Sequence, residues 1–63
     1  MIYLYSIENC SACEKLKAHY IKNNIKFEER SGDRMKNPED EIDILALCEA
    51  SNTNMTFPVV VEK

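Results

Sequence analysis

The sequence predicts a small α/β domain in which strands and helices alternate in the order β-α-β-α-β. An apolar and aromatic run of strand length, Ile2–Ser6, comes first. Two later stretches repeat apolar side chains at helical spacing, and a short alternating stretch lies between them. A β-branched run from Val59 to Val61 comes last. The 63 residues allow a single domain, residues 1–63, at a size that buries only roughly 60% of the unfolded chain's surface.

Composition and charge exclude several classes of protein. With 44% hydrophobic and 30% charged residues, the chain has the composition of a globular domain rather than of a disordered one. The net charge is −3 and the lysines form no basic face, so we expect no nucleic-acid partner. No apolar run approaches the roughly 20 residues that span a bilayer, so we expect no membrane partner. The strand pattern begins directly after Met1 without a leader pattern, which predicts a cytoplasmic protein.

The strands differ in how many of their faces should be buried. Ile2–Ser6 is almost continuously apolar, which is typical of a central strand covered on both faces. Residues 25–28 alternate apolar and polar, as in an edge strand with one buried face. The third strand covers residues 56–61, with Pro58 near its start, where a missing N–H is tolerated. We expect the first two strands to be parallel, joined by a right-handed crossover, and the third to pair with the first. This gives a three-stranded mixed sheet of order 2-1-3.

The first helix is expected over residues 14–23. Leu16, Tyr20 and Ile21 recur at helical spacing, whereas the charged side chains fall on the other face. Asn23-Asn24 should end the helix, because asparagine tolerates the left-handed conformation that follows many helices.

The second helix has a strong start signal, with Asn37 as the expected N-cap, Pro38 as the first helical residue and acidic residues in the first turn. The apolar stripe of this helix is expected at Ile42, Leu45 and Cys48, widened by Ile44 and Leu47. The helix should end near Ser51-Asn52.

Cys10-Ser11-Ala12-Cys13 lies between the first strand and the first helix, where thiol redox chemistry is often placed. N–H groups and the helix dipole stabilise an anion at a helix start by roughly 0.3–1 kcal/mol. Cys10 is therefore the expected nucleophile, and Cys13, in the first turn, can resolve a mixed disulfide. Glu8 and Glu14 disfavour a thiolate, so we expect a reductant rather than an oxidant.

A CxxC pair can also be half of a metal site, which usually needs four ligands. Only Cys48 and His19 remain as partners, and a free cysteine on an apolar stripe is most often a small buried residue. We therefore favour redox chemistry and expect no metal site within one chain. A cluster shared across a dimer stays open.

The order strand, CxxC, helix, strand, helix, followed by Thr56-Phe57-Pro58-Val59-Val60, resembles a glutaredoxin, the compact branch of the thioredoxin fold. The resemblance implies a thiol-disulfide oxidoreductase with Cys10 and Cys13 as catalytic residues and no bound cofactor. It also implies that Pro58 is cis and that Thr56, Phe57 and Pro58 bind the substrate, a protein or small-molecule disulfide. The implied electron source is glutathione or a thioredoxin-reductase-type donor.

The sequence departs from the glutaredoxin pattern at three places. Ile7 stands where the family commonly has a lysine for glutathione, and Ser11-Ala12 replaces a common Pro-Tyr. The family's last strand and helix, with a glycine pair that binds glutathione, are expected to be missing. Glutathione dependence therefore stays open. The third strand should then be an apolar sheet edge, and we expect a homodimer or docking partner along this edge, from Phe57 to Val61.

Two other functions stay open. The fold could serve as a redox-sensing or metal- or iron-sulfur-binding module without turnover, or as an arsenate reductase or Spx-like protein, suggested by Asn9-Cys10 and residues 27–30. Arg30 and Arg34 are expected to be solvated loop residues. The three tyrosines are expected to pack with their hydroxyl groups in water.

Overall fold

The computed structural model describes residues 1–63 and contains the expected alternation of strands and helices. The elements are β1 (Ile2–Ser6), α1 (Ser11–Lys22), β2 (Phe27–Ser31), the 3-10 turn η1 (Gly32–Met35), α2 (Glu41–Asn52) and β3 (Val59–Glu62). Neither helix has the length and apolar character needed to cross a membrane.

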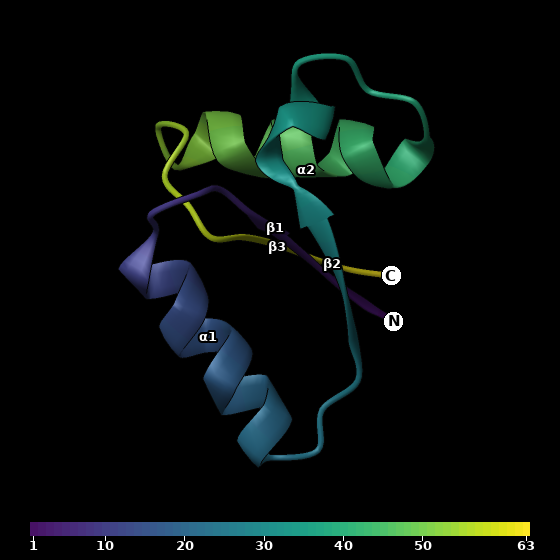
Figure 1. Ribbon diagram of the computed structural model, residues 1–63. Coiled ribbons are helices and arrows are strands. Elements are labelled where there is room, and N and C mark those ends of the chain that lie inside the picture. The colour runs from purple at the N-terminus through teal and green to yellow at the C-terminus, as the bar shows by residue number, and fades with distance from the viewer.

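The three strands form one mixed sheet in the order β2-β1-β3, as predicted. β1 pairs with β2 in parallel and with β3 in antiparallel orientation, so the apolar β1 is central. α1 lies on one face of the sheet, and α2 with η1 lies on the other (Figure 1). The two termini meet at one end of the sheet, where Lys63 N–H donates to the Met1 carbonyl at 2.9 Å. β3 is an edge strand, and a homodimer through this edge stays a prediction.

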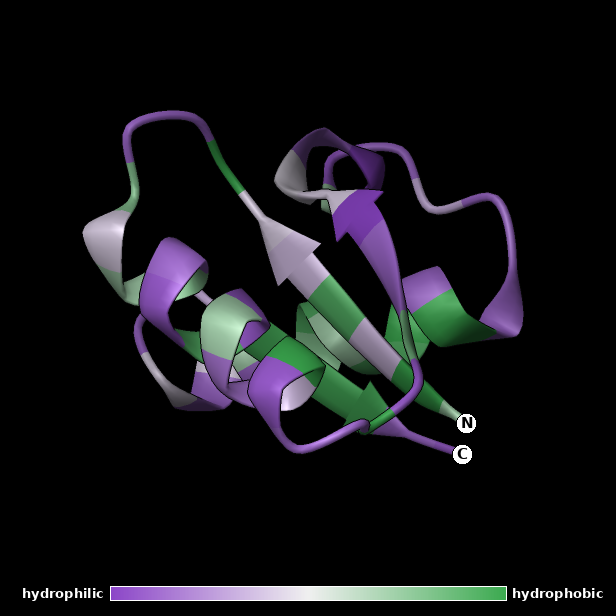
Figure 2. Ribbon diagram, turned by 60° about the horizontal axis from the view of Figure 1, so that its bottom comes forward, coloured by the Kyte–Doolittle hydropathy of each residue, from purple (hydrophilic) through white to green (hydrophobic).

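The larger core lies between the sheet and α2. Its buried members come from β1, β3, η1 and α2: Tyr5, Met35, Ala46, Ala50, Val59 and Val61. Two alanines on α2 let its backbone approach the sheet closely, and the larger strand side chains fill the space between them. Figure 2 shows the apolar residues running along β1 and β3, whereas β2 is mostly hydrophilic. Of the three strands, β1 and β3 therefore contribute the side chains that pack against α2.

The face of the sheet covered by α1 has fewer buried side chains. Leu4 and Cys13 are its fully buried side chains, and the Tyr20 and Phe27 rings pack with their centroids 5.3 Å apart. Ile21, which the sequence analysis placed on the apolar stripe, is 68% exposed. Cys13 takes the buried position instead, so the second cysteine of the pair is part of the packing of α1 against the sheet.

The start predicted for the second helix is wrong. Asp40, rather than Asn37, is the N-cap of α2, with extended φ and ψ of −139° and 177°. Its carboxylate accepts a hydrogen bond from Asp43 N–H at 2.9 Å. Aspartate caps helices as well as asparagine does, and Asp40 also binds Arg30, which decides between the two positions.

The stripe predicted for the second helix is only partly right: Ile42 and Leu47 pack against the core, but Ile44, Leu45 and Cys48 do not. Asp43, Ala46 and Ala50 are fully buried, whereas Ile44 is 54% exposed and Cys48 is exposed. The helix is rotated so that a carboxylate and two small residues face the sheet. Hydrophobic spacing alone could not reveal this rotation, because it depends on partners of Asp43 elsewhere in the chain.

Two strand boundaries differ from those predicted. β2 covers Phe27–Ser31 rather than residues 25–28, and β3 begins at Val59 rather than at Thr56. Ile2 lies opposite Phe27, so pairing with β1 sets the range of β2. Asn24 has a φ of 55°, which confirms the left-handed turn expected after α1.

Candidate functional site

Cys10 is the N-cap of α1, which covers Ser11–Lys22 rather than the expected residues 14–23 and so begins directly after this cysteine. The preceding Asn9 has a φ of 56°, a left-handed conformation that asparagine tolerates, and this turns the chain from β1 into the helix. The Cys10 backbone is extended, and its Sγ accepts a hydrogen bond from Cys13 N–H at 3.2 Å. Cys10 therefore takes the place of the serine or aspartate that usually caps a helix, and its sulfur lies against the helix N–H groups.

Cys13 lies in the first turn, directly beside Cys10. The two cysteines are both free thiols and are 2.5 Å apart at their closest approach. Cys13 is 1% exposed whereas Cys10 is only partly buried, so Cys10 is the sulfur that a substrate can reach. Burial, followed by the contact with Cys10, raises the pKa of the Cys13 thiol. The Ile7 N–H and the Lys17 ammonium act on that pKa in the opposite direction.

The peptide bond between Phe57 and Pro58 is cis, in agreement with the expectation from the resemblance. Val59 lies opposite Tyr5, so continuing this register brings Phe57 level with Ile7, in the loop that leads to Cys10. A Cβ atom on Gly32 would lie 2.7 Å from Phe57 Cε1 and 2.8 Å from Ile7 Cγ2. The structure therefore packs the residue before the cis proline against the loop before the cysteine pair.

Thr56, the third residue expected to bind substrate, is exposed, and its hydroxyl donates to the Thr53 carbonyl at 2.9 Å. This bond holds Thr56 to the turn between α2 and β3. Of the five expected site residues, the structure joins Cys10 to Cys13 within one helical turn and places Phe57 and Pro58 directly before β3.

An open pocket of about 660 Å³ lies at the carboxyl ends of β1 and β2, beside the start of α1. Ligands of α/β proteins commonly bind at this end of a parallel strand pair. The pocket is lined by Ser6, Ile7, Glu8, Glu14, Lys17, Glu29, Arg30, Ser31 and Asp33. Four carboxylates face two cations here, and both cations are already held in ion pairs. The pocket therefore has no unpaired cationic side chain that could bind an anion.

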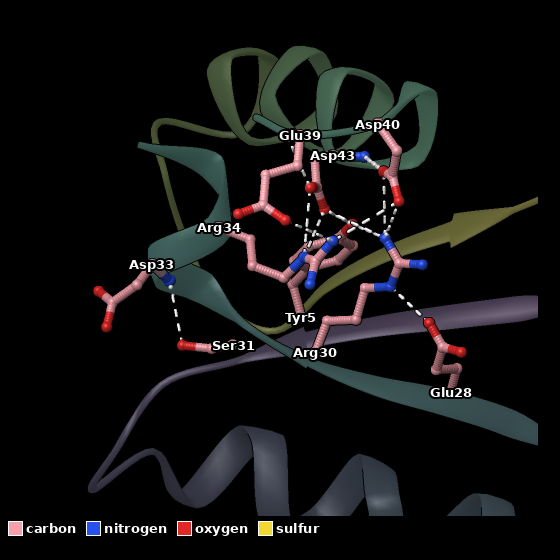
Figure 3. Close-up of polar contacts among 9 residues, drawn as sticks. All are labelled: Tyr5, Glu28, Arg30, Ser31, Asp33, Arg34, Glu39, Asp40 and Asp43. Carbon is pink, nitrogen blue, oxygen red and sulfur yellow. Dashed lines mark hydrogen bonds and ion pairs between the residues drawn. The ribbon is translucent and has the colours of Figure 1, made fainter. Parts of the chain in front are cut away.

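A buried ionic network, which no sequence pattern predicted, lies on the other face of the sheet. Asp43 is fully buried and accepts hydrogen bonds from Tyr5, from Arg34 Nε at 3.0 Å and from Arg30 Nη1 at 3.2 Å (Figure 3). The Glu39 N–H donates to the same carboxylate at 3.1 Å. The prediction that both arginines are merely solvated is wrong, and so is the prediction of a wet Tyr5 hydroxyl.

The network joins β1, β2, η1 and α2 through one carboxylate. Burial by itself raises the pKa of Asp43, but hydrogen bonds from Arg34, Tyr5 and the Glu39 N–H outweigh it and hold this pKa well below its usual range. Burial, followed by the hydrogen bond to Asp43, raises the pKa of Tyr5 to about 12. Every buried polar side-chain atom has a hydrogen-bond partner, so the network is fully hydrogen-bonded and has a structural role. An acidic residue at the spacing of Ala46 and Ala50 was the one sequence signal that could have revealed it.

Cys48 lies on α2, which is on the opposite face of the sheet from the cysteine pair (Figure 1). No group of three or more histidine, cysteine, aspartate or glutamate side chains is placed to hold a metal ion. In comparisons with known proteins, no family model, no curated protein and no solved structure matches this chain.

Proposed function

We propose that this protein is a thiol-disulfide oxidoreductase of glutaredoxin-like, thioredoxin-fold type, which reduces disulfides of proteins or small molecules. The observation that carries the proposal is the position of Cys10. It is the N-cap of α1, with its sulfur accepting the Cys13 N–H and with the second thiol beside it. A partly exposed thiol at a helix start with a buried thiol one turn later is an arrangement suited to disulfide exchange.

The proposed reaction has two exchanges. The Cys10 thiolate attacks one sulfur of the substrate disulfide, which forms a mixed disulfide and releases the other sulfur as a thiolate that takes a proton from water. The Cys13 thiol then loses its proton to solvent and attacks the Cys10 sulfur. The bond from Cys10 to the substrate breaks, and the substrate leaves as its second thiol. Two electrons pass from the protein dithiol to the substrate, and the protein is left with a Cys10–Cys13 disulfide.

The substrate is proposed to lie across Thr56, Phe57 and Pro58, with the Phe57 backbone pairing with an extended segment. Support comes from the packing of Phe57 against Ile7, in the loop that precedes Cys10. A reductase or glutathione would then return the disulfide to the dithiol. The neighbouring pocket has no unpaired cationic side chain that could bind a glutathione carboxylate. This favours a reductase as the electron donor.

Coupled disulfide-reduction assays test this function, with either thioredoxin reductase or glutathione and its reductase supplying the electrons. We expect turnover in at least one system, and we expect Cys10→Ser to abolish it. Cys13→Ser should trap a mixed disulfide with a protein substrate, visible as an added mass. Cys48→Ser is the matched control and should keep full activity, because Cys48 is exposed on the opposite side of the sheet.

Activity that survives Cys10→Ser would refute the assigned nucleophile. Absence of turnover in both systems would refute the enzyme and, together with reversible formation of the Cys10–Cys13 disulfide, would favour a redox sensor.

A further inference from the structure

Lys17 lies on the face of α1 that packs against the sheet, one turn after Cys13. The side chains of this face, from Cys13 to Leu16, Lys17 and Tyr20, are the buried or half-buried ones of the helix. The Lys17 side chain is 23% exposed. Its neighbour Lys15 is exposed on the opposite face and forms no ion pair. The two lysines thus share a helix and a charge but not an environment.

Lys17 bridges two elements through carboxylates. Its Nζ lies 2.7 Å from Glu29 Oε2 on β2 and 3.0 Å from Glu14 Oε1 on α1. These two glutamates and Glu8 line the pocket beside the start of α1. Arg30, the other cation of the pocket, is committed to Asp40 and Asp43. Lys17 is therefore the cation that balances the carboxylates next to the cysteine pair.

The position of Lys17 bears on the second exchange of the proposed reaction, because Cys13 must lose its proton before it can attack Cys10. The thiol is buried and interacts with Cys10 and the Ile7 N–H, and Lys17 lies four residues further along the same face of α1. Nearby carboxylates disfavour a thiolate, and a nearby ammonium favours it. Lys17 holds Glu14 and Glu29 at its own ammonium, one helical turn from Cys13, and carboxylates left unpaired at that place would disfavour a thiolate.

We propose that Lys17 is a positioning residue for resolution of the mixed disulfide: it holds Glu14 and Glu29 as ion pairs and thereby keeps the Cys13 thiol able to ionise. This inference rests on the proposed function. In the step concerned, Cys13 releases a proton to solvent and its thiolate forms a bond to the Cys10 sulfur. The bond between Cys10 and the substrate sulfur breaks, and the substrate leaves as a thiolate. Lys17 stays protonated and exchanges no proton with either thiol.

A single-turnover experiment isolates this step. In a Cys48→Ser background, Cys10 is converted at acidic pH to its mixed disulfide with thionitrobenzoate, and the pH is then raised in a series of jumps. Attack by Cys13 releases the yellow thionitrobenzoate anion, whose rate of appearance gives the pH profile of resolution. We expect Lys17→Met to move the midpoint of this profile upward by roughly half to one pH unit, so that release at pH 7 slows by about three- to tenfold.

Matched variants separate electrostatics from a structural role. Lys15→Met removes the same charge from the same helix and should leave the profile unchanged. Lys17→Arg keeps the charge and should keep the wild-type pH profile. Lys17→Met combined with Glu14→Gln and Glu29→Gln removes the carboxylates as well and should return the midpoint to the wild-type value. Glu14→Gln alone, at a mostly exposed side chain, should move the midpoint downward and keeps the test available if Lys17→Met does not fold.

Coincident profiles for Lys17→Met and Lys15→Met would overturn the proposal, as would a loss of rate that is equal at every pH. An unchanged midpoint in Glu14→Gln would overturn it as well. Absence of any release in the wild-type background would instead refute Cys13 as the resolving thiol, and with it the proposed function.

Discussion

Gly32 is a residue whose small size follows from its neighbours. It is buried at the start of η1, and the Phe57 ring and the Ile7 side chain occupy the space where a Cβ would lie, at 2.7 and 2.8 Å. Its backbone has no positive φ, so the requirement for glycine is one of space and not of conformation. Gly32 thus determines how closely Phe57 approaches the loop before Cys10.

We predict that Gly32→Ala destabilises the fold by about 1–3 kcal/mol, because the added methyl group must displace a ring or a branched side chain. Urea unfolding measures the change. Phe57→Leu introduced into Gly32→Ala should recover part of the lost stability, since leucine vacates the space of the ring. A Gly32→Ala protein as stable as the wild type would show that Phe57 moves aside at no cost.

At the scale of one element, α2 shows that a helix can be predicted from the sequence while its rotation about its own axis is not. Its end near Asn52 agrees with the sequence, whereas its first residue and the centre of its buried face do not. The buried face carries Asp43 followed by Ala46 and Ala50, whereas a larger apolar side chain such as Leu45 is 37% exposed. The buried carboxylate, with two arginines and a tyrosine around it, outweighs the apolar stripe in orienting the helix.

We predict that Asp40→Ala lowers the Tm by about 4–8 °C, because it removes the N-cap of α2. Asn37→Ala, at the position expected from the sequence, should change the Tm by much less. Asp40→Asn is the informative control, since asparagine keeps the cap but not the charge that binds Arg30. Circular dichroism melts compare the three variants. Equal losses for Asn37→Ala and Asp40→Ala would contradict the observed cap.

At the scale of the whole molecule, the two faces of the sheet have different roles. The α2 face holds most of the buried core and the Asp43 network, and the α1 face carries the cysteine pair with little buried apolar surface. A domain of this size has a free energy of unfolding of only about 3–9 kcal/mol, so loss of the Asp43 network would affect the stability of the entire fold. Removing one partner of a buried ion pair typically costs about 3–5 kcal/mol.

We predict that the protein loses stability as the pH falls below about 4, and that Asp43 is a main cause. The pKa of Asp43 is depressed in the folded state, so its contribution is present above the unfolded aspartate pKa of about 3.9 and is lost as the pH falls toward the folded value. Asp43→Asn should therefore be much less stable at pH 7, and its Tm should depend less on pH. Asp33→Asn, at an exposed side chain, should follow the wild-type curve. Parallel pH curves for Asp43→Asn and the wild type would contradict this prediction.

Features with local causes could be predicted from the sequence. The apolar run of β1 made it the central strand, Cys10 stands before a helix start and became its N-cap, and Asn24 could take the left-handed turn after α1. The cis bond at Pro58 agreed with the family resemblance and not with local propensity, because only about 5–6% of bonds before proline are cis.

Features that depend on partners far apart in the chain could not be predicted before the fold was known. Asp43 is buried because Tyr5, Arg30 and Arg34 reach it from three other elements, and no pattern within α2 shows that they will. Lys17 likewise looks like any helix lysine until β2 brings Glu29 against it. A charged side chain is solvated or buried according to whether its partners converge, and convergence is a property of the folded chain.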